Sequence, residues 1–407
     1  MLSRSLLAPD SPLRKPDVAR LFVAYLLSYT GSAMAPIAMA FGVLELTGST
    51  KDAAIVIAAP TLASIVVLLV GGALADRLSR QKIMAIADTL AMLAQLSMAA
   101  LFLTSNATVP LLTALMLANG IAIALNAPAA TGLIVQLVDK NQLQATNALL
   151  GMARHGAVAG GAALGGLLVA LYGAGITLAI DGLSFGLSAL LVLSLKPKPQ
   201  RPLAKASMIQ DLVLGWREFT RHRWLWVIVL QFSLVVAGLE AVFGLLGPAV
   251  AREQMNGAAD WGIIAGVFGL GMIIGGLLGV VVRPRYPMRF GSLWVFSFSL
   301  VPLALALALP VYAVAVCALI SGIGGQLFST LWNTTLQQRI PGELLSRVSA
   351  YDHLGSIALA PLGILLAGLL FELIGARDTL LLAAALIIVP TAGVLLVADV
   401  RQLQAPS

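Results

Sequence analysis

Four ionisable side chains lie inside long apolar stretches of the sequence, where they have the greatest potential for chemistry. Arg154 and His155 are adjacent in one stretch, Asp181 falls in the next, and Glu240 falls in a third. Burying an ionisable group in an apolar environment is costly, so such a residue predicts a function such as reversible protonation or cation binding. The alternative is a structural hydrogen bond or ion pair, for example between one of the acids and Arg154.

Two more acids, Asp88 and Asp352, lie near the ends of their apolar stretches. A side chain close to the end of a membrane helix can extend toward the polar headgroups. We therefore expect an interfacial charge or a local ion pair at both positions.

Polar and aromatic residues in four of the stretches recur three, four or seven positions apart. This spacing places them on one face of each helix. Such a face could line a cavity or form hydrogen bonds between helices. The residues are Tyr25, Tyr29 and Ser32; Asn119 and Asn126; Ser233 and Glu240; and Gln326, Ser329, Thr330 and Asn333.

Common catalytic and metal-binding motifs are absent from the sequence. There is no G-x-x-x-x-G-K-[ST] loop for ATP and no H-E-x-x-H motif. Three histidines and the single Cys317 do not suggest a zinc site, and one cysteine forms no intrachain disulfide. We expect no enzyme activity, no cofactor and no metal.

The elements that position these residues are predicted to be membrane-spanning helices. Of the 407 residues, 59% are hydrophobic and only 11% are charged, whereas roughly a quarter are charged in a soluble protein. A helical span needs about 20 apolar residues, and a β-barrel strand only about ten that alternate with polar ones. The sequence therefore predicts an all-α membrane protein with twelve spans, at 19–45, 53–75, 82–104, 109–137, 143–171, 175–195, 223–250, 260–282, 289–308, 310–338, 348–373 and 378–399.

The basic residues predict how these helices cross the membrane. With both termini in the cytoplasm, 21 Lys and Arg residues fall in cytoplasmic segments and three, Lys51, Arg252 and Arg377, fall on the other side. Cytoplasmic loops are enriched in Lys and Arg, so both termini are predicted to be inside. The net charge of +7 follows this pattern and does not indicate nucleic-acid binding.

The sequence repeats weakly at an offset of 202 residues, where Gly120 aligns with Gly322 and Gly173 aligns with Gly375. Membrane proteins with duplicated halves use them to form alternating states around a site at the membrane midplane. We predict two pseudo-symmetric six-helix halves, residues 1–195 and 223–407, joined by a cytoplasmic linker, 196–222. From Met208 onward the linker pattern predicts an amphipathic helix.

A charged motif, GGALADRLSRQK, follows the second predicted span at residues 71–82. It resembles the signature G-x-x-x-D-R-x-G-R-R/K of the major facilitator superfamily, which implies a latch that closes the cytoplasmic side. Asp76 would face the positive end of a helix, and the arginines would pair with Asp139. The predicted latch residues are Gly72, Asp76, Arg77, Arg80, Asp139 and Arg347.

Other segments narrow the resemblance. Residues 41–49, 137–149, 181–185 and 334–356 are similar to a bacterial branch that holds enterobactin-type siderophore exporters and macrolide-efflux proteins. The resemblance covers nearly the whole chain and implies the major facilitator fold. It also implies proton-coupled export of a bulky, partly apolar molecule, with the polar faces named above lining a central cavity. Their chemistry suits a neutral or weakly cationic amphiphile.

The sequence departs from these relatives at several positions. Ser79 replaces a glycine of the loop motif, and the second-half copy at 279–289 lacks the acid, so the latch is predicted to be one-sided. Met116 stands where drug antiporters often have arginine, and Ser32 stands where this branch often has aspartate. We expect proton coupling to depend on Asp181, Glu240, Arg154 or His155.

The fifth predicted span has glycines at every fourth position, including Gly156, Gly160, Gly161 and Gly165. Small residues at this spacing predict close packing of helices. A role specific to antiporters is the alternative, because antiporters carry a Gly-Pro version of this motif.

Two kinds of function are consistent with the sequence. The first is a secondary transporter that exports a drug, siderophore or secondary metabolite, with a lipid or lysophospholipid flippase or a metabolite importer of the same fold as alternatives. The second is a membrane receptor or enzyme, which lacks support because no catalytic group is recognisable. As partners we expect a small-molecule substrate and the lipid bilayer, no nucleic acid, and a monomeric protein in the bacterial inner membrane.

Overall fold

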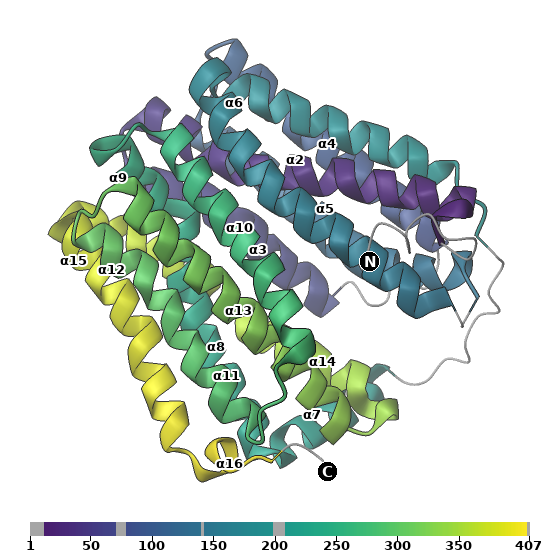
Figure 1. The fold of residues 1–407 in the computed structure, drawn as a ribbon. Coiled ribbons are helices and arrows are strands. Elements are labelled where there is room, and N and C mark those ends of the chain that lie inside the picture. Colours follow the sequence, from purple (N-terminus) through teal and green to yellow (C-terminus); the bar gives the residue numbers. More distant parts are fainter. Residues whose placement is uncertain (1–11, 71–78, 140–141, 198–207, 405–407) are drawn as a thin grey trace. The chain divides into compact units, whose positions relative to one another are not determined.

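The computed structural model describes residues 12–70, 79–139, 142–197 and 208–404 (Figure 1). Within these ranges the regular structure is helical and there is no strand. Contacts divide the chain into two units. The first comprises Met1–Gly48 and Ile55–Pro202, and the second comprises Ser49–Ala54 and Leu203–Ser407.

Ten helical segments of the described residues are long and apolar enough to cross a membrane. Two of them, Ala145–Leu193 and Arg347–Leu396, have 49 and 50 residues, whereas one span needs about 20. Each contains a glycine with non-helical backbone angles, Gly173 in one and Gly375 in the other. The predicted all-helical membrane fold is confirmed. The number of twelve requires each long segment to form two spans, and it stays a prediction.

The described part of the first unit begins with a short 3-10 turn, and long helices follow. α6 packs along both α2 and α4, and α4 packs along α5. Gly161 and Gly165 of α6 lie against the backbone of α2, where a side chain would overlap Thr30 and Met34. The elements are η1 (Pro12–Arg14), α2 (Pro16–Thr47), α4 (Arg80–Leu103), α5 (Val109–Leu137), α6 (Leu143–Leu193) and α3 (Thr50–Val70). The first residues of α3, up to Ala54, belong to the second unit.

The glycines of the fifth predicted span therefore divide into two groups. Gly161 and Gly165 have the packing role that their spacing predicts. A Cβ atom at Gly156 or Gly160 would meet no atom within 4 Å among the described residues. These two glycines are not needed for the contact between α2 and α6.

Apart from Ser49–Ala54, the described part of the second unit consists of an amphipathic helix followed by apolar ones. α7 begins at Met208, where the amphipathic pattern of the sequence begins, and packs on α14. α8 packs along α15, and α10 packs along α13 (Figure 1). The elements are α7 (Met208–Arg221), α8 (Arg223–Ala241), η4 (Val242–Leu246), α9 (Gly247–Gln254), α10 (Ala258–Val281), α11 (Pro287–Val295), η5 (Phe296–Ser299), α12 (Leu300–Ala306), α13 (Val311–Arg339), α14 (Gly342–Ile357), α15 (Ala360–Leu396) and α16 (Ala398–Arg401).

Corresponding positions of the two units have the same local structure. Gly173 has φ and ψ of 78° and 176°, and Gly375 has 84° and 170°. The hydroxyl of Thr177 donates to the Gly173 carbonyl oxygen at 3.0 Å, and the hydroxyl of Thr379 donates to the Gly375 carbonyl oxygen at 2.8 Å. Both pairs are separated by the 202-residue offset of the sequence repeat. The repeat therefore has a structural counterpart at this turn.

Candidate functional site

Asp181 occupies a closed site in the first unit. It lies on α6 with none of its surface exposed, and a Cβ atom on Gly31 of α2 would overlap its carboxyl oxygen Oδ1. Neither carboxyl oxygen has a hydrogen-bond partner among the described residues. The hydroxyl of Ser184 donates instead to the backbone carbonyl oxygen of Asp181 at 2.7 Å. An unpaired buried charge costs several kcal/mol, so the site suits a carboxyl group that carries a proton.

Arg154 and His155 lie in the first part of α6, before the kink at Gly173, whereas Asp181 lies after the kink. The Arg154 guanidinium carbon is 5.7 Å from the centroid of the Tyr29 ring, and that ring lies 5.3 Å from the Tyr25 ring. Arg154 forms no ion pair within the described ranges, so its recognised partner is an aromatic face of α2. His155 is half-buried beside it.

Glu240 belongs to the second unit. It is exposed near the end of α8, directly before the π-helical turn Val242–Leu246. Turns of this kind interrupt the regular hydrogen bonds of a helix and are frequent at functional sites. The structure thus places Arg154 and His155 before the Gly173 kink of α6, Asp181 after that kink, and Glu240 in the other unit.

Asp88 corrects a prediction made from the sequence. Instead of reaching toward the surface, its side chain is only 1% exposed and joins three helices of the first unit. The amide of Asn126 on α5 donates to Oδ1 at 2.7 Å, and the hydroxyl of Ser188 on α6 donates to Oδ2 at 2.7 Å. Distance along the sequence from the end of a span does not reveal which face of the helix carries the residue. Asn126, predicted to line a cavity, is used in this network.

The remaining predicted cavity residues of the first unit differ in exposure. Tyr25 is buried, Tyr29 is half-buried and Ser32 is exposed. Asn119 is buried, and its amide oxygen has no hydrogen-bond partner within the described ranges.

In the second unit the predicted polar face of α13 is divided. Gln326 lies against Gly275 of α10, and Thr330 lies against Gly279 of the same helix. Ser329 and Asn333 instead line a pocket next to α8 and α14. Helix packing and pocket lining therefore share the polar residues of α13. The remaining polar residue predicted on α8, Ser233, is buried.

The predicted latch is visible only in part. The Arg80 guanidinium lies where a side chain on Gly132 of α5 would be. Asp139 forms an ion pair with Lys15, with Oδ2 and Nζ 3.2 Å apart. Arg347 lies on α14 against α7. Pairing of Asp139 with the arginines of the motif stays a prediction, because part of the motif is not described. The latch residues outside the described ranges are Gly72, Asp76 and Arg77.

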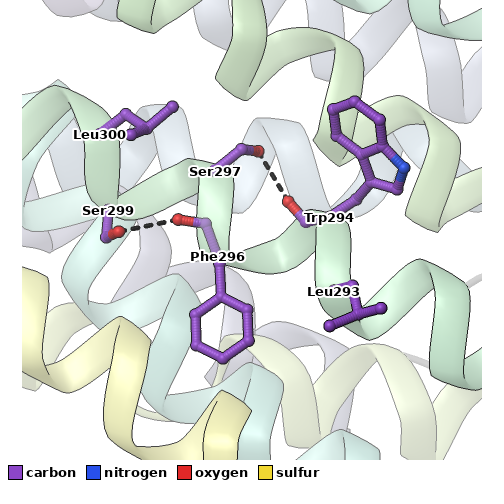
Figure 2. Close-up of a pocket in the computed structure, with 6 residues that line it drawn as sticks. All are labelled: Leu293, Trp294, Phe296, Ser297, Ser299 and Leu300. Atoms are coloured by element: carbon purple, nitrogen blue, oxygen red, sulfur yellow. Dashed lines mark hydrogen bonds between the residues drawn. The ribbon is translucent and has the colours of Figure 1, made fainter.

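One surface hollow in the second unit has a volume of about 450 Å³ and is lined by a single segment, 293–300. Figure 2 shows that its two hydroxyls are already used: Ser297 donates to the Trp294 carbonyl oxygen and Ser299 to the Phe296 carbonyl oxygen, both at 2.7 Å. No charged residue lines this hollow. Beyond these hydroxyls its lining side chains are apolar except for the indole N–H of Trp294, so it offers few groups for specific recognition.

The second pocket, of about 230 Å³, is partly open and is lined by three helices of the second unit. Its lining combines an acid with aromatic rings, a combination that the sequence reasoning missed. Phe328 and Trp332 are four residues apart on α13, which places both rings on one face of that helix. This spacing could have indicated an aromatic lining from the sequence. The lining residues are Ile228, Val229 and Phe232 of α8; Gly325, Phe328, Ser329, Trp332 and Asn333 of α13; and Asp352, His353 and Ser356 of α14.

Sequence comparison relates nearly the whole chain to membrane exporters. The model of the transmembrane secretion effector family matches residues 7–406. The multidrug efflux pump Tap of Mycobacterium tuberculosis is 28% identical over 385 residues, which cover 91% of this chain and 90% of that protein. The enterobactin exporter EntS of Escherichia coli is 25% identical over 362 residues, which cover 86% of this chain and 85% of that protein.

Solved structures share the fold at low sequence identity. A bacterial homologue of the human lysosomal transporter Spinster, in an inward-facing and unoccupied conformation, has a TM-score of 0.76 at 14% identity and covers 97% of this chain and 99% of its own. The nucleoside transporter NupG has a TM-score of 0.74 at 14% identity, over 93% of this chain and 98% of its own.

Proposed function

Since this chain belongs to the transmembrane secretion effector family of the major facilitator fold and is a multi-pass membrane transporter rather than an enzyme, we propose that it exports an amphiphilic small molecule in exchange for protons. The molecule is a drug-like compound, a siderophore or a secondary metabolite. It moves by alternating access from the cytoplasm across the bacterial inner membrane, with both chain termini in the cytoplasm. The transporter works as a monomer without a cofactor.

Asp181 is the observation that supports proton coupling. Its carboxyl group lies between α6 and α2 without a hydrogen-bond partner among the described residues. Such a group is stable there with a proton and unstable without one. Release of the proton requires water or a cation to reach the carboxyl group, which a rearrangement of α2 against α6 provides. Substrate movement and proton release are thereby linked.

The names of the sequence relatives favour export over the other transport functions. Tap is named a multidrug efflux pump and EntS an enterobactin exporter. An importer or a lipid flippase of the same fold remains the second candidate. A flippase requires a cavity that opens sideways to lipid, and it needs no proton gradient.

The test begins with a thermal-shift screen of the purified protein against lipophilic cations, siderophores and lysophospholipids. A compound that stabilises the protein is then measured for transport into proteoliposomes with and without an imposed pH gradient. We expect transport only with the gradient. Asp181→Asn should still bind the compound but lose the response to the gradient.

Two further results separate the alternatives. Glu240→Gln should keep gradient-dependent transport. If Glu240→Gln instead loses gradient-dependent transport while Asp181→Asn keeps it, coupling would be assigned to Glu240. Transport of a lysophospholipid at the same rate with and without the gradient would favour the flippase.

A further inference from the structure

The pocket of the second unit differs from an ordinary gap between helices because its aromatic rings are ordered in a row. The Phe232 and Phe328 rings stack with centroids 4.5 Å apart, and the Phe328 and Trp332 rings lie at 6.1 Å with an interplanar angle of 15°. Trp224 supports the far end of the row by an edge contact with Trp332 at 5.6 Å. Rings held in this way are already ordered, so a ligand that binds beside them causes little further loss of side-chain freedom.

A carboxylate is fixed at the same pocket. The indole N–H of Trp332 donates to Oδ2 of Asp352 at 2.9 Å, which holds the acid against the aromatic row. Within the described ranges Asp352 has no ion pair, and no lysine or arginine lines the pocket. The charge of Asp352 is therefore not balanced by a lysine or arginine of this pocket, and the basic group on its lining is the imidazole of His353.

We infer that this pocket binds the cationic, aromatic end of a lipophilic organic cation. The faces of Trp and Phe rings attract a cation, and the Asp352 carboxylate adds the opposite charge. Ser329 and Asn333 provide hydroxyl and amide groups on the same lining. An anionic group would be repelled by the acid and would find no lysine or arginine on the lining. The pocket thus selects cations over anions among amphiphilic compounds.

The size of the pocket limits what enters it. At about 230 Å³ it is smaller than the roughly 300–1,000 Å³ that encloses a drug-sized ligand. It therefore takes one end of a larger molecule, such as a ring that carries a quaternary ammonium group. Its role as part of the export pathway rests on the proposed function, but cation binding does not.

The test measures binding of ethidium, a fluorescent aromatic cation, to purified full-length protein in nanodiscs without a pH gradient. Benzyltrimethylammonium is expected to displace ethidium, and benzenesulfonate, which has the opposite charge, is not. Asp352→Asn should weaken ethidium binding at least tenfold, because it removes the charge. The amide oxygen can still accept the Trp332 N–H, so the fold should be retained. Phe328→Leu should weaken binding as well, because it interrupts the aromatic row.

Glu253→Gln is the matched control, because it removes one negative charge from an exposed position of α9 in the same unit. It should bind ethidium as the unmodified protein does. Equal affinity of Asp352→Asn and the unmodified protein would overturn the inference, and so would displacement by benzenesulfonate as effective as by benzyltrimethylammonium. The competition experiment uses the unmodified protein and does not depend on how the variants fold. Ethidium binding without gradient-dependent export would reject the proposed function and leave this inference intact.

Discussion

At the scale of single residues, Gly31 determines whether the Asp181 carboxyl group can be accommodated. A Cβ atom at position 31 would overlap both Asp181 and Ser184. We expect Gly31→Ala to displace the Asp181 side chain and to destabilise the protein by about 1–3 kcal/mol, as overpacking of a core does. Export should fall as it does in Asp181→Asn.

The control for this change is Gly160→Ala, because a Cβ atom there would meet no atom within 4 Å. It should melt at the same temperature as the unmodified protein or slightly higher, since alanine favours helix. Thermal unfolding in detergent and gradient-driven export measure both variants. An unchanged melting temperature for Gly31→Ala would mean that α2 and α6 are not as close as described.

The buried network at Asp88 gives a second prediction at this scale. Ser188→Ala removes a hydrogen bond of 2.7 Å to an acid that is 1% exposed. Leaving a buried acceptor unsatisfied costs about 1–3 kcal/mol, so the melting temperature should fall. Ser28→Ala is the comparison, because within the described ranges the Ser28 hydroxyl bonds only to the Ala24 carbonyl oxygen of its own helix, at 2.9 Å. Equal effects of the two changes would argue against the network.

The sequence predicted some functional residues and not others for a physical reason. An acid in the middle of an apolar span is costly wherever it faces, and Asp181 was recognised on that basis. The partners of Asp88 and the aromatic row beside Asp352 depend on which helices lie next to each other. That adjacency is absent from a single sequence. Spacing on one helix also grouped Gln326 with Ser329, although only Ser329 lines the pocket.

At the scale of helices, the turns at Gly173 and Gly375 require glycine. Their φ angles of 78° and 84°, combined with ψ of 176° and 170°, lie in a region that is essentially restricted to glycine and costs other residues about 1–3 kcal/mol. We expect Gly173→Ala and Gly375→Ala each to lower the melting temperature. Gly393→Ala is the control for Gly375→Ala, because both glycines lie on α15 and position 393 has ordinary helical geometry and open space around it. Circular dichroism melting of the purified variants is the measurement, and equal melting of Gly375→Ala and Gly393→Ala would contradict the prediction.

The start of α3 depends on an acid from another helix. The Glu372 carboxylate on α15 accepts from the Ser49 hydroxyl at 2.7 Å and from the Lys51 backbone N–H at 3.0 Å. Free N–H groups and a positive dipole end at a helix start favour such an acid. Glu372→Ala should increase hydrogen exchange at the first turn of α3, measured by mass spectrometry. Glu372→Gln should have a smaller effect, because its amide oxygen can still accept. Unchanged exchange in Glu372→Ala would show that the cap is dispensable.

At the scale of the whole molecule, the repeat preserves the backbone but not the chemistry. The 202-residue offset relates Gly173 to Gly375, but it relates Asp181 to Ala383, Asp88 to Phe290 and Asp352 to Leu150. The buried acids of the first unit thus have no acidic counterpart in the second, and the acid of the aromatic pocket has none in the first. The two halves of the repeat therefore share backbone structure at corresponding positions but carry different polar side chains there. The repeat was therefore useful for predicting the fold and not for predicting sites.

The orientation of the whole chain is the last prediction, and it follows from the distribution of basic residues. Lys51 and Arg401 are both exposed, and the positive-inside rule assigns them to opposite sides of the membrane. Cys317 is the single cysteine, so Cys317→Ser gives a background without thiols. In that background Lys51→Cys should react with a membrane-impermeant maleimide in intact cells, whereas Arg401→Cys should react only after permeabilisation. The reverse pattern would place both termini outside and would invert the side on which the proposed exporter takes up its substrate. Reaction of both in intact cells would mean either that the number of spans between the two positions is even rather than odd or that one position is not held on a single side. The twelve-span prediction would then need revision.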